Sequence, residues 1–179
     1  GVKYQDEVPI KIGDFASAIE QAMSGRPQSL MFEPGRLIVA NAGVLLTTVN
    51  TLKCNDEKNF AVVDAAMNDL IRPALYSAWQ EVIPVSLKEG VVSPKINWDI
   101  VGPVCETGDF LAKDRMLSLE EDDLLAILSA GAYGFVMSSN YNSRPRSPEI
   151  LVSGQEHDCI RKRETIDDLF VLESMKPFS

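Results

Sequence analysis

A cysteine and a glutamate that are adjacent in the sequence could transfer a proton. Cys105 and Glu106 lie within the run GPVCETGDFLAKDR. A carboxylate beside a thiol disfavours the thiolate, so the cysteine could keep its proton and act as an acid. A structural cysteine that enters a turn explains the same residues. The residues alone leave both interpretations open.

A turn, and a pair of residues on one face of a helix, could each bind an anion. The run EPGR at 33–36 could be an ordinary Pro-Gly turn. It could also be a phosphate loop in which the backbone N–H groups of Gly35 and Arg36 face the anion. Arg72 and Tyr76 are four residues apart, so both would project from one face of a helix. That pair could lie on the surface or form one wall of a carboxylate site.

Composition excludes several classes of protein. The chain has 179 residues and a net charge of −9, which argues against non-specific nucleic-acid binding. No apolar run approaches the ~20 residues of a membrane-spanning helix, so we expect no membrane association. Cys54, Cys105, Cys159 and the single His157 have no metal-ligand spacing, so we expect no bound metal. Free thiols without a secretory signal favour a cytoplasmic location.

The first 38 residues read as one α/β unit. Residues 14–23 predict an amphipathic helix that Asp14 begins and Gly25 ends. The apolar run 29–32 is then expected to form a buried strand before the EPGR turn. One such unit cannot close a sheet by itself.

The rest of the chain predicts a mainly β fold. Strands are expected at 44–53, 60–63, 96–104 and 123–128, and a hairpin is expected to join 149–152 to 159–163 around Gly154. A helix is expected over 65–78, with Pro73 in its first turn or at a kink. A capping pattern at 165–168 predicts a terminal helix over 169–175.

Four motifs, in this order, resemble those of the diaminopimelate decarboxylases: EPGR, DAAMNDLIRPALY, GPVCETGDFLAKDR and SAGAYGFVMSSNYNSRPR. These are pyridoxal-phosphate enzymes of lysine biosynthesis, related to ornithine and arginine decarboxylases, and the resemblance covers essentially the whole chain. It implies that residues 1–38 are the end of a (β/α)₈ barrel and residues 39–179 a C-terminal β-barrel or sandwich domain. The lysine that binds the cofactor covalently is then expected upstream, and this chain alone is expected to be inactive.

The resemblance also implies a set of cofactor contacts. Glu33 matches the carboxylate that keeps the ring nitrogen of pyridoxal phosphate protonated. Gly35 and Arg36 match main-chain contacts to the cofactor phosphate, and Pro34 shapes their loop. Tyr133 of the GAYG run matches a family tyrosine beside cofactor and substrate.

Substrate contacts and an acid follow from the same resemblance. The side chains of Arg36, Arg72 and Tyr76 match contacts to an amino-acid substrate that carries a second carboxylate. Glu106 matches the partner of the substrate's distal ammonium group. Cys105 matches the proton donor, and Cys105 and Glu106 are expected to reach into the site of a partner subunit in a homodimer.

Three other functions stay open at this level. A sister decarboxylase could act on another carboxylated diamine such as carboxynorspermidine. A catalytically dead relative could bind and regulate a partner, although it would have no reason to keep both Glu33 and Cys105. A free-standing β-domain could serve in binding, although the helix and apolar run before residue 38 argue against it.

Overall fold

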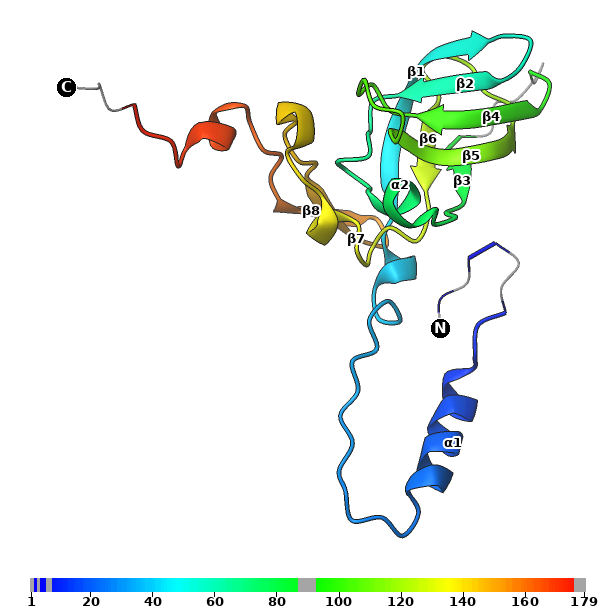
Figure 1. Ribbon diagram of the computed structural model, residues 1–179, viewed down its shortest axis with the longest axis vertical. Coiled ribbons are helices and arrows are strands. Elements are labelled where there is room, and N and C mark those ends of the chain that lie inside the picture. The colour runs from blue at the N-terminus through cyan, green and yellow to red at the C-terminus, as the bar shows by residue number, and fades with distance from the viewer. Residues whose placement is uncertain (1, 3, 6–7, 87–92, 176–179) are drawn as a thin grey trace.

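The centre of the molecule is a six-stranded sheet that curls into a nearly closed barrel, at the upper right of Figure 1. The computed structural model describes residues 2, 4, 5, 8–86 and 93–175. The strand order is β3-β6-β1-β2-β4-β5, and the two edge strands β3 and β5 contact each other. The strands are β1 Leu45–Cys54, β2 Asn59–Val63, β3 Val82–Pro84, β4 Ile96–Val101, β5 Phe110–Leu117 and β6 Leu124–Ile127. The mainly β fold expected from the sequence is confirmed.

Apolar side chains from all six strands fill the barrel. The fully buried ones include Val49, Val63, Ile100, Leu111, Leu125 and Ile127. β2 and β4 pair in parallel, whereas the other neighbours are antiparallel. The four strands expected between residues 44 and 128 are confirmed, with ends shifted by at most three residues. β3 and β5 were not expected from the sequence.

An arm precedes the barrel and hangs below it in Figure 1. Its helix, α1 Ile12–Met23, confirms the one expected at 14–23, but it begins after Lys11, with Asp14 in its first turn. The expected buried strand at 29–32 is wrong: the segment is extended and exposed, with Met31 92% exposed. A strand needs a hydrogen-bonded neighbour, and none of the described strands pairs with this segment. Phe32 contacts Phe15 of α1, with ring centroids 6.2 Å apart.

The loop that follows β2 contains less helix than expected. Only α2 Arg72–Tyr76 is helical within the expected helix 65–78, with Pro73 in its first turn. At the start of the loop, side chains accept hydrogen bonds from two backbone N–H groups. The Asp69 carboxylate accepts from Ala66 N (2.9 Å), and Thr47 Oγ1 accepts from Ala65 N (3.0 Å).

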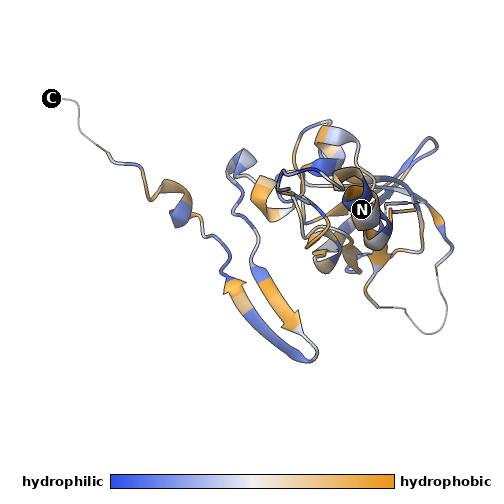
Figure 2. Ribbon diagram, turned by 90° about the horizontal axis from the view of Figure 1, so that it is seen from below, coloured by the Kyte–Doolittle hydropathy of each residue, from blue (hydrophilic) through white to orange (hydrophobic). Residues whose placement is uncertain are grey.

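The chain ends in a hairpin and an extended tail. β7 Glu149–Ser153 pairs with β8 Glu156–Arg161, which confirms the expected hairpin, and Figure 2 shows apolar residues along its exposed strands. Thr165 caps the next turn through Asp168, as expected. The expected helix 169–175 is wrong, because the chain forms only the 3₁₀ turn η4 Asp167–Phe170 and Leu172 is 96% exposed. The other 3₁₀ turns are η1 Ala40–Ala42, η2 Phe135–Met137 and η3 Tyr141–Ser143.

Candidate active site

A pocket of about 600 Å³ opens where the first residues and the EPGR turn meet α2. Its volume lies within the range of small-molecule sites, about 300–1,000 Å³. The lining residues are Tyr4, Gln5, Arg36, Arg72, Tyr76, Ser77, Ala78 and Trp79. Among the residues that the structure describes, this lining holds two guanidinium groups and three aromatic side chains and no carboxylate. The lining therefore suits a ligand that is flat and anionic.

α2 places Arg72 and Tyr76 in this pocket. Pro73 suits the first turn because a helix leaves the N–H groups there unbonded. Ser77 adopts the left-handed conformation (φ 50°) and ends the helix after one turn. The guanidinium carbon of Arg72 lies 5.5 Å from the centre of the Tyr76 ring, so the expected pair on one face is confirmed. Arg72 Nε is buried and has no hydrogen-bond partner among the described residues, which leaves a donor for a ligand.

The EPGR run forms a turn and also borders the pocket. Leu37 N donates to Pro34 O at 3.3 Å, and Ala40 N donates to Arg36 O at 3.0 Å. Gly35 has a φ of 58°, the left-handed region that favours glycine. The Arg36 guanidinium stacks 5.2 Å from the centre of the Tyr4 ring.

Tyr133 joins the EPGR turn to α2. A Cβ on Gly35 would lie 3.5 Å from the Tyr133 hydroxyl oxygen, which is an ordinary contact distance. The Arg72 guanidinium carbon lies 5.9 Å from the Tyr133 ring. Gly35, Arg36, Arg72, Tyr76 and Tyr133 are therefore brought together, although they come from three separate motifs. Pro34 lies in the same turn, whereas Glu33 is exposed in the segment before it and does not line the pocket.

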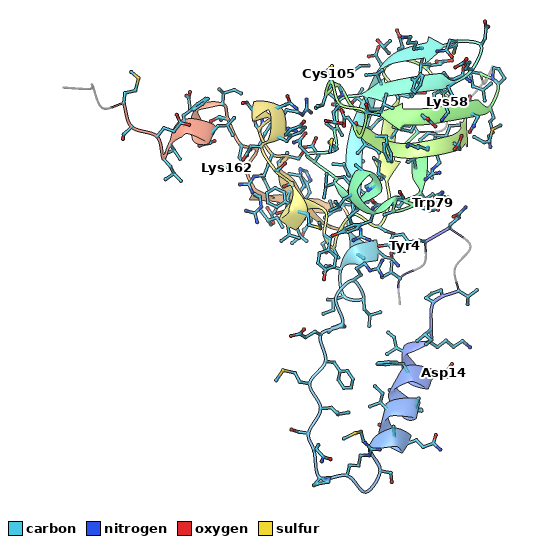
Figure 3. The ribbon with its side chains drawn as sticks, in the orientation of Figure 1. Tyr4, Asp14, Lys58, Trp79, Cys105 and Lys162 are labelled. Atoms are coloured by element: carbon cyan, nitrogen blue, oxygen red, sulfur yellow. The ribbon has the colours of Figure 1, made fainter. Side chains whose placement is uncertain are left out.

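Cys105 and Glu106 lie elsewhere in the same chain. Figure 3 shows Cys105 well apart from Tyr4 and Trp79, which mark the pocket. Both residues are exposed in the tight turn that follows β4. Within this turn Glu106 N donates to Val104 O at 2.8 Å, and Asp109 N donates to Glu106 O at 3.0 Å. Within one chain, the candidate acid does not reach the pocket.

Several contributors to the site were missed from the sequence. Tyr4, Gln5 and Trp79 line the pocket, and the Tyr141 hydroxyl donates to Glu106 Oε2 at 3.4 Å. Tyr4 and Gln5 could not be found by pattern, because they lie about 30 residues before the turn they meet. Trp79 lies beyond the end of α2 at Tyr76, so helical spacing gave no signal for it.

The half-buried Arg115 and the buried Gln80 hold Trp79 in the pocket wall. The Arg115 guanidinium stacks on the Trp79 ring at 4.5 Å and donates to Gln80 O at 3.1 Å. Burial is the largest influence on Arg115, and it lowers the pKa of that guanidinium. Gln80 is fully buried and donates to the carbonyl oxygens of Leu128 (3.0 Å) and Ser129 (3.1 Å). These bonds attach the pocket wall to the barrel.

Among the residues that the structure describes, no group of three His, Cys, Asp or Glu side chains is arranged to hold a metal ion. None of the helices described has the length and apolar character needed to cross a bilayer.

Comparison with known proteins identifies the domain. Residues 12–131 match the family model described as "Pyridoxal-dependent decarboxylase, C-terminal sheet domain". The chain is 58% identical over 177 residues to diaminopimelate decarboxylase from Pseudomonas fluorescens, covering 99% of this chain and 42% of that protein. The chain thus spans less than half the length of such curated relatives.

Solved structures show the same relationship. Diaminopimelate decarboxylase from Helicobacter pylori, complexed with L-lysine, superposes with a TM-score of 0.86 at 44% identity, covering 97% of this chain and 42% of that chain. The enzyme from M. jannaschii gives a TM-score of 0.90 at 36% identity, covering 99% of this chain and 42% of that chain.

Proposed function

Because the chain belongs to the pyridoxal-dependent decarboxylase family, we propose that it is the C-terminal part of a diaminopimelate decarboxylase, which converts meso-2,6-diaminopimelate to L-lysine and carbon dioxide. The observation that carries this proposal is the pocket in which Arg36 and Arg72 converge among tyrosines. Residues 1–38 would extend the barrel domain of the whole enzyme, and residues 39–179 would form its β-domain.

The substrate's chemistry matches the two arginines. Diaminopimelate keeps a carboxylate at its non-reacting end, and a guanidinium binds a carboxylate through two parallel hydrogen bonds. Arg72 has a buried Nε without a partner and rings on two sides, from Tyr76 and Tyr133. We assign Arg72 and Tyr76 to this distal end, with Arg36 as a second contact. A substrate without a second carboxylate would leave Arg72 unused.

The residues present fit pyridoxal phosphate. Gly35 has no side chain, so its backbone is accessible to a phosphate group, and Tyr133 lies beside it. Gly35 and Arg36 would hold the phosphate in the turn shaped by Pro34, and Glu33 would pair with the ring nitrogen. Once bound, this cofactor accepts the electron pair left on the substrate's α-carbon when carbon dioxide departs.

Cys105 would supply the proton that completes the reaction. Its thiol would donate a proton to the α-carbon that has lost carbon dioxide, and the neighbouring Glu106 would bind the distal ammonium group. Both residues are exposed, and Cys105 lies away from the pocket of its own chain. We therefore propose a homodimer in which each site takes its acid from the partner subunit. The three free, exposed cysteines are compatible with a reducing, cytoplasmic location.

A substrate assay tests this function. The full-length enzyme that carries this sequence is incubated with pyridoxal phosphate and meso-2,6-diaminopimelate, and carbon dioxide and lysine are quantified. We expect equal amounts of both products, and no comparable turnover of ornithine, arginine or carboxynorspermidine. Preferential turnover of carboxynorspermidine would identify a sister decarboxylase. A lack of turnover with every substrate would favour a regulatory relative.

A further inference from the structure

Asp109 is a buried carboxylate that joins two parts of the proposed site. The residue is only 3% exposed. Its Oδ1 accepts a hydrogen bond from Met67 N and its Oδ2 accepts one from Val104 N, both at 2.7 Å. Charge-assisted bonds of this length are the stronger class of hydrogen bond.

The two donors lie in functionally different loops. Val104 directly precedes Cys105, the proposed acid. Met67 lies in the loop that leads from β2 into α2, which carries Arg72 and Tyr76. One carboxylate thus fixes the backbone next to the thiol and attaches it to the loop that leads into the anion-binding helix.

The backbone of Asp109 closes the same turn. Its N–H donates to Glu106 O and its carbonyl accepts from Gly102 N, both at 3.0 Å. Gly102 leaves room for the carboxylate, because a Cβ there would lie 2.5 Å from Oδ1 and 2.7 Å from Cγ. The side chain and backbone of Asp109 thus bind Gly102, Val104 and Glu106 within this turn.

We propose that Asp109 is a positioning residue for Cys105, acting through the backbone of Val104. This inference rests on the proposed function, in which Cys105 is the proton donor. A carboxylate suits the role because each of its two oxygens accepts one N–H bond. An asparagine would turn its amide NH₂ towards one of the two N–H donors, so one bond would be lost.

Asp99 provides a matched control. It is also buried, at 7% exposed, and its carboxylate accepts from Asp114 N (2.9 Å) and Lys58 Nζ (2.5 Å). Figure 3 shows Lys58 on the side of the barrel away from Cys105. Asp99→Asn therefore disturbs a comparable buried carboxylate without touching the turn.

The experiment is a double-mutant cycle in the full-length enzyme at saturating substrate. Thermal unfolding first fixes a temperature at which all the variants are folded. We expect Asp109→Asn to lower kcat about 10- to 100-fold, the loss typical of a reacting group misplaced by about 1 Å. In a Cys105→Ala background the same change should lower kcat less than about threefold, because its target is already absent. Asp99→Asn should leave kcat within about twofold in both backgrounds.

The outcomes separate this inference from the function on which it rests. Equal losses from Asp109→Asn in both backgrounds, or no loss in either, would overturn the positioning role while Cys105 remains the donor. An unaffected Cys105→Ala enzyme would instead refute the donor assignment. Gly102→Ala offers a second variant, since its methyl group displaces the carboxylate without removing it. Like Asp109→Asn, it should lower kcat strongly when Cys105 is present and only weakly in the Cys105→Ala background. Equal losses of kcat in both backgrounds would count against the proposal.

Discussion

Substitution of Gly43 by alanine should destabilise the junction between the arm and the barrel. A Cβ on Gly43 would lie 2.5 Å from the Cα of Gly131 and 2.7 Å from its nitrogen. Ordinary contact begins at 3.4 Å, so the two backbones would have to separate by about 0.9 Å, and a shift of this kind costs about 1–3 kcal/mol.

Two backbone hydrogen bonds join the same two segments, which carry Gly43 and Gly131. Ala130 N donates to Gly43 O at 2.8 Å, and Gly131 N donates to Ala40 O at 3.0 Å. Each such bond contributes about 0.5–1.5 kcal/mol, so the expected total loss is about 2–6 kcal/mol. For a chain of this size, at about 2–4 °C per kcal/mol, that corresponds to a fall in Tm of about 4–24 °C.

Calorimetry would measure the Tm of each variant, and substrate kinetics of the full-length enzyme would measure its KM. Tyr133 lies two residues beyond Gly131, so Gly43→Ala should also raise KM by loosening the contact between Tyr133 and the EPGR turn. Gly13→Ala is the matched control, because Gly13 lies in α1 and, apart from the adjacent residues and the backbone of its own helix, no atom of the described residues lies within 4 Å of the new methyl group. Its Tm should stay the same or rise slightly, since alanine favours a helix by up to about 1 kcal/mol. If the Gly43→Ala protein unfolds with the wild-type Tm, the close approach of the Gly43 and Gly131 backbones is refuted.

Three further predictions concern the acid, the anion site and pH. Cys105→Ala should lower kcat by a factor of about 10²–10⁴, the range for a lost general acid, and near-wild-type turnover would dismiss the assignment. Arg72→Ala should weaken substrate binding by about 2–5 kcal/mol, as when a buried charge pair is broken, and an unchanged KM would exclude the role. The Arg146 guanidinium, bonded at 2.7 Å, is the main cause that lowers the pKa of Glu164 to about 2. Because that pKa is depressed on folding, the stability it contributes is complete above pH 4.5 and lost as the pH falls towards 2. The difference in unfolding free energy between wild type and Glu164→Gln should shrink over that window, and a difference independent of pH there would contradict the pair.

The sequence predicts the strands whose own residues decide their structure. β1 is rich in β-branched residues, and Asn55 supplies the turn before β2 by accepting from Glu57 N and Lys58 N. The hairpin around Gly154 is likewise local, since Gly154 adopts a φ of 63°. These elements could be predicted because their signals lie within a few residues.

Elements that depend on distant partners could not be predicted in this way. The helix expected over 65–78 is interrupted because Asn68 is buried and bonded to the backbone of Ser139, 71 residues away, through its Nδ2 and its carbonyl oxygen. The segments 29–32 and 169–175 have apolar composition, but no described part of this chain buries them. Apolar pattern alone does not say what an element packs against.

The candidate site likewise contains residues that the sequence predicts and residues that only the folded structure shows. The spacing of Arg72 and Tyr76 predicts their shared helical face, and motif resemblance selects the EPGR turn and Tyr133. Neither indicates that Tyr4 stacks on Arg36, because that contact depends on how the chain folds back. Asp109 was also missed, since its role depends on two hydrogen bonds that only the folded structure shows.

The account depends most on the claim that Arg72 of one chain and Cys105 of another complete the same site. A hybrid-dimer experiment tests it directly, by mixing full-length Arg72→Ala and Cys105→Ala enzymes under conditions that exchange subunits. If each site draws these residues from different chains, half of the dimers are hybrids with one intact site, so about one quarter of wild-type activity should return. If activity stays at the level of the two separate variants although mass spectrometry shows hybrid dimers, the shared site is contradicted.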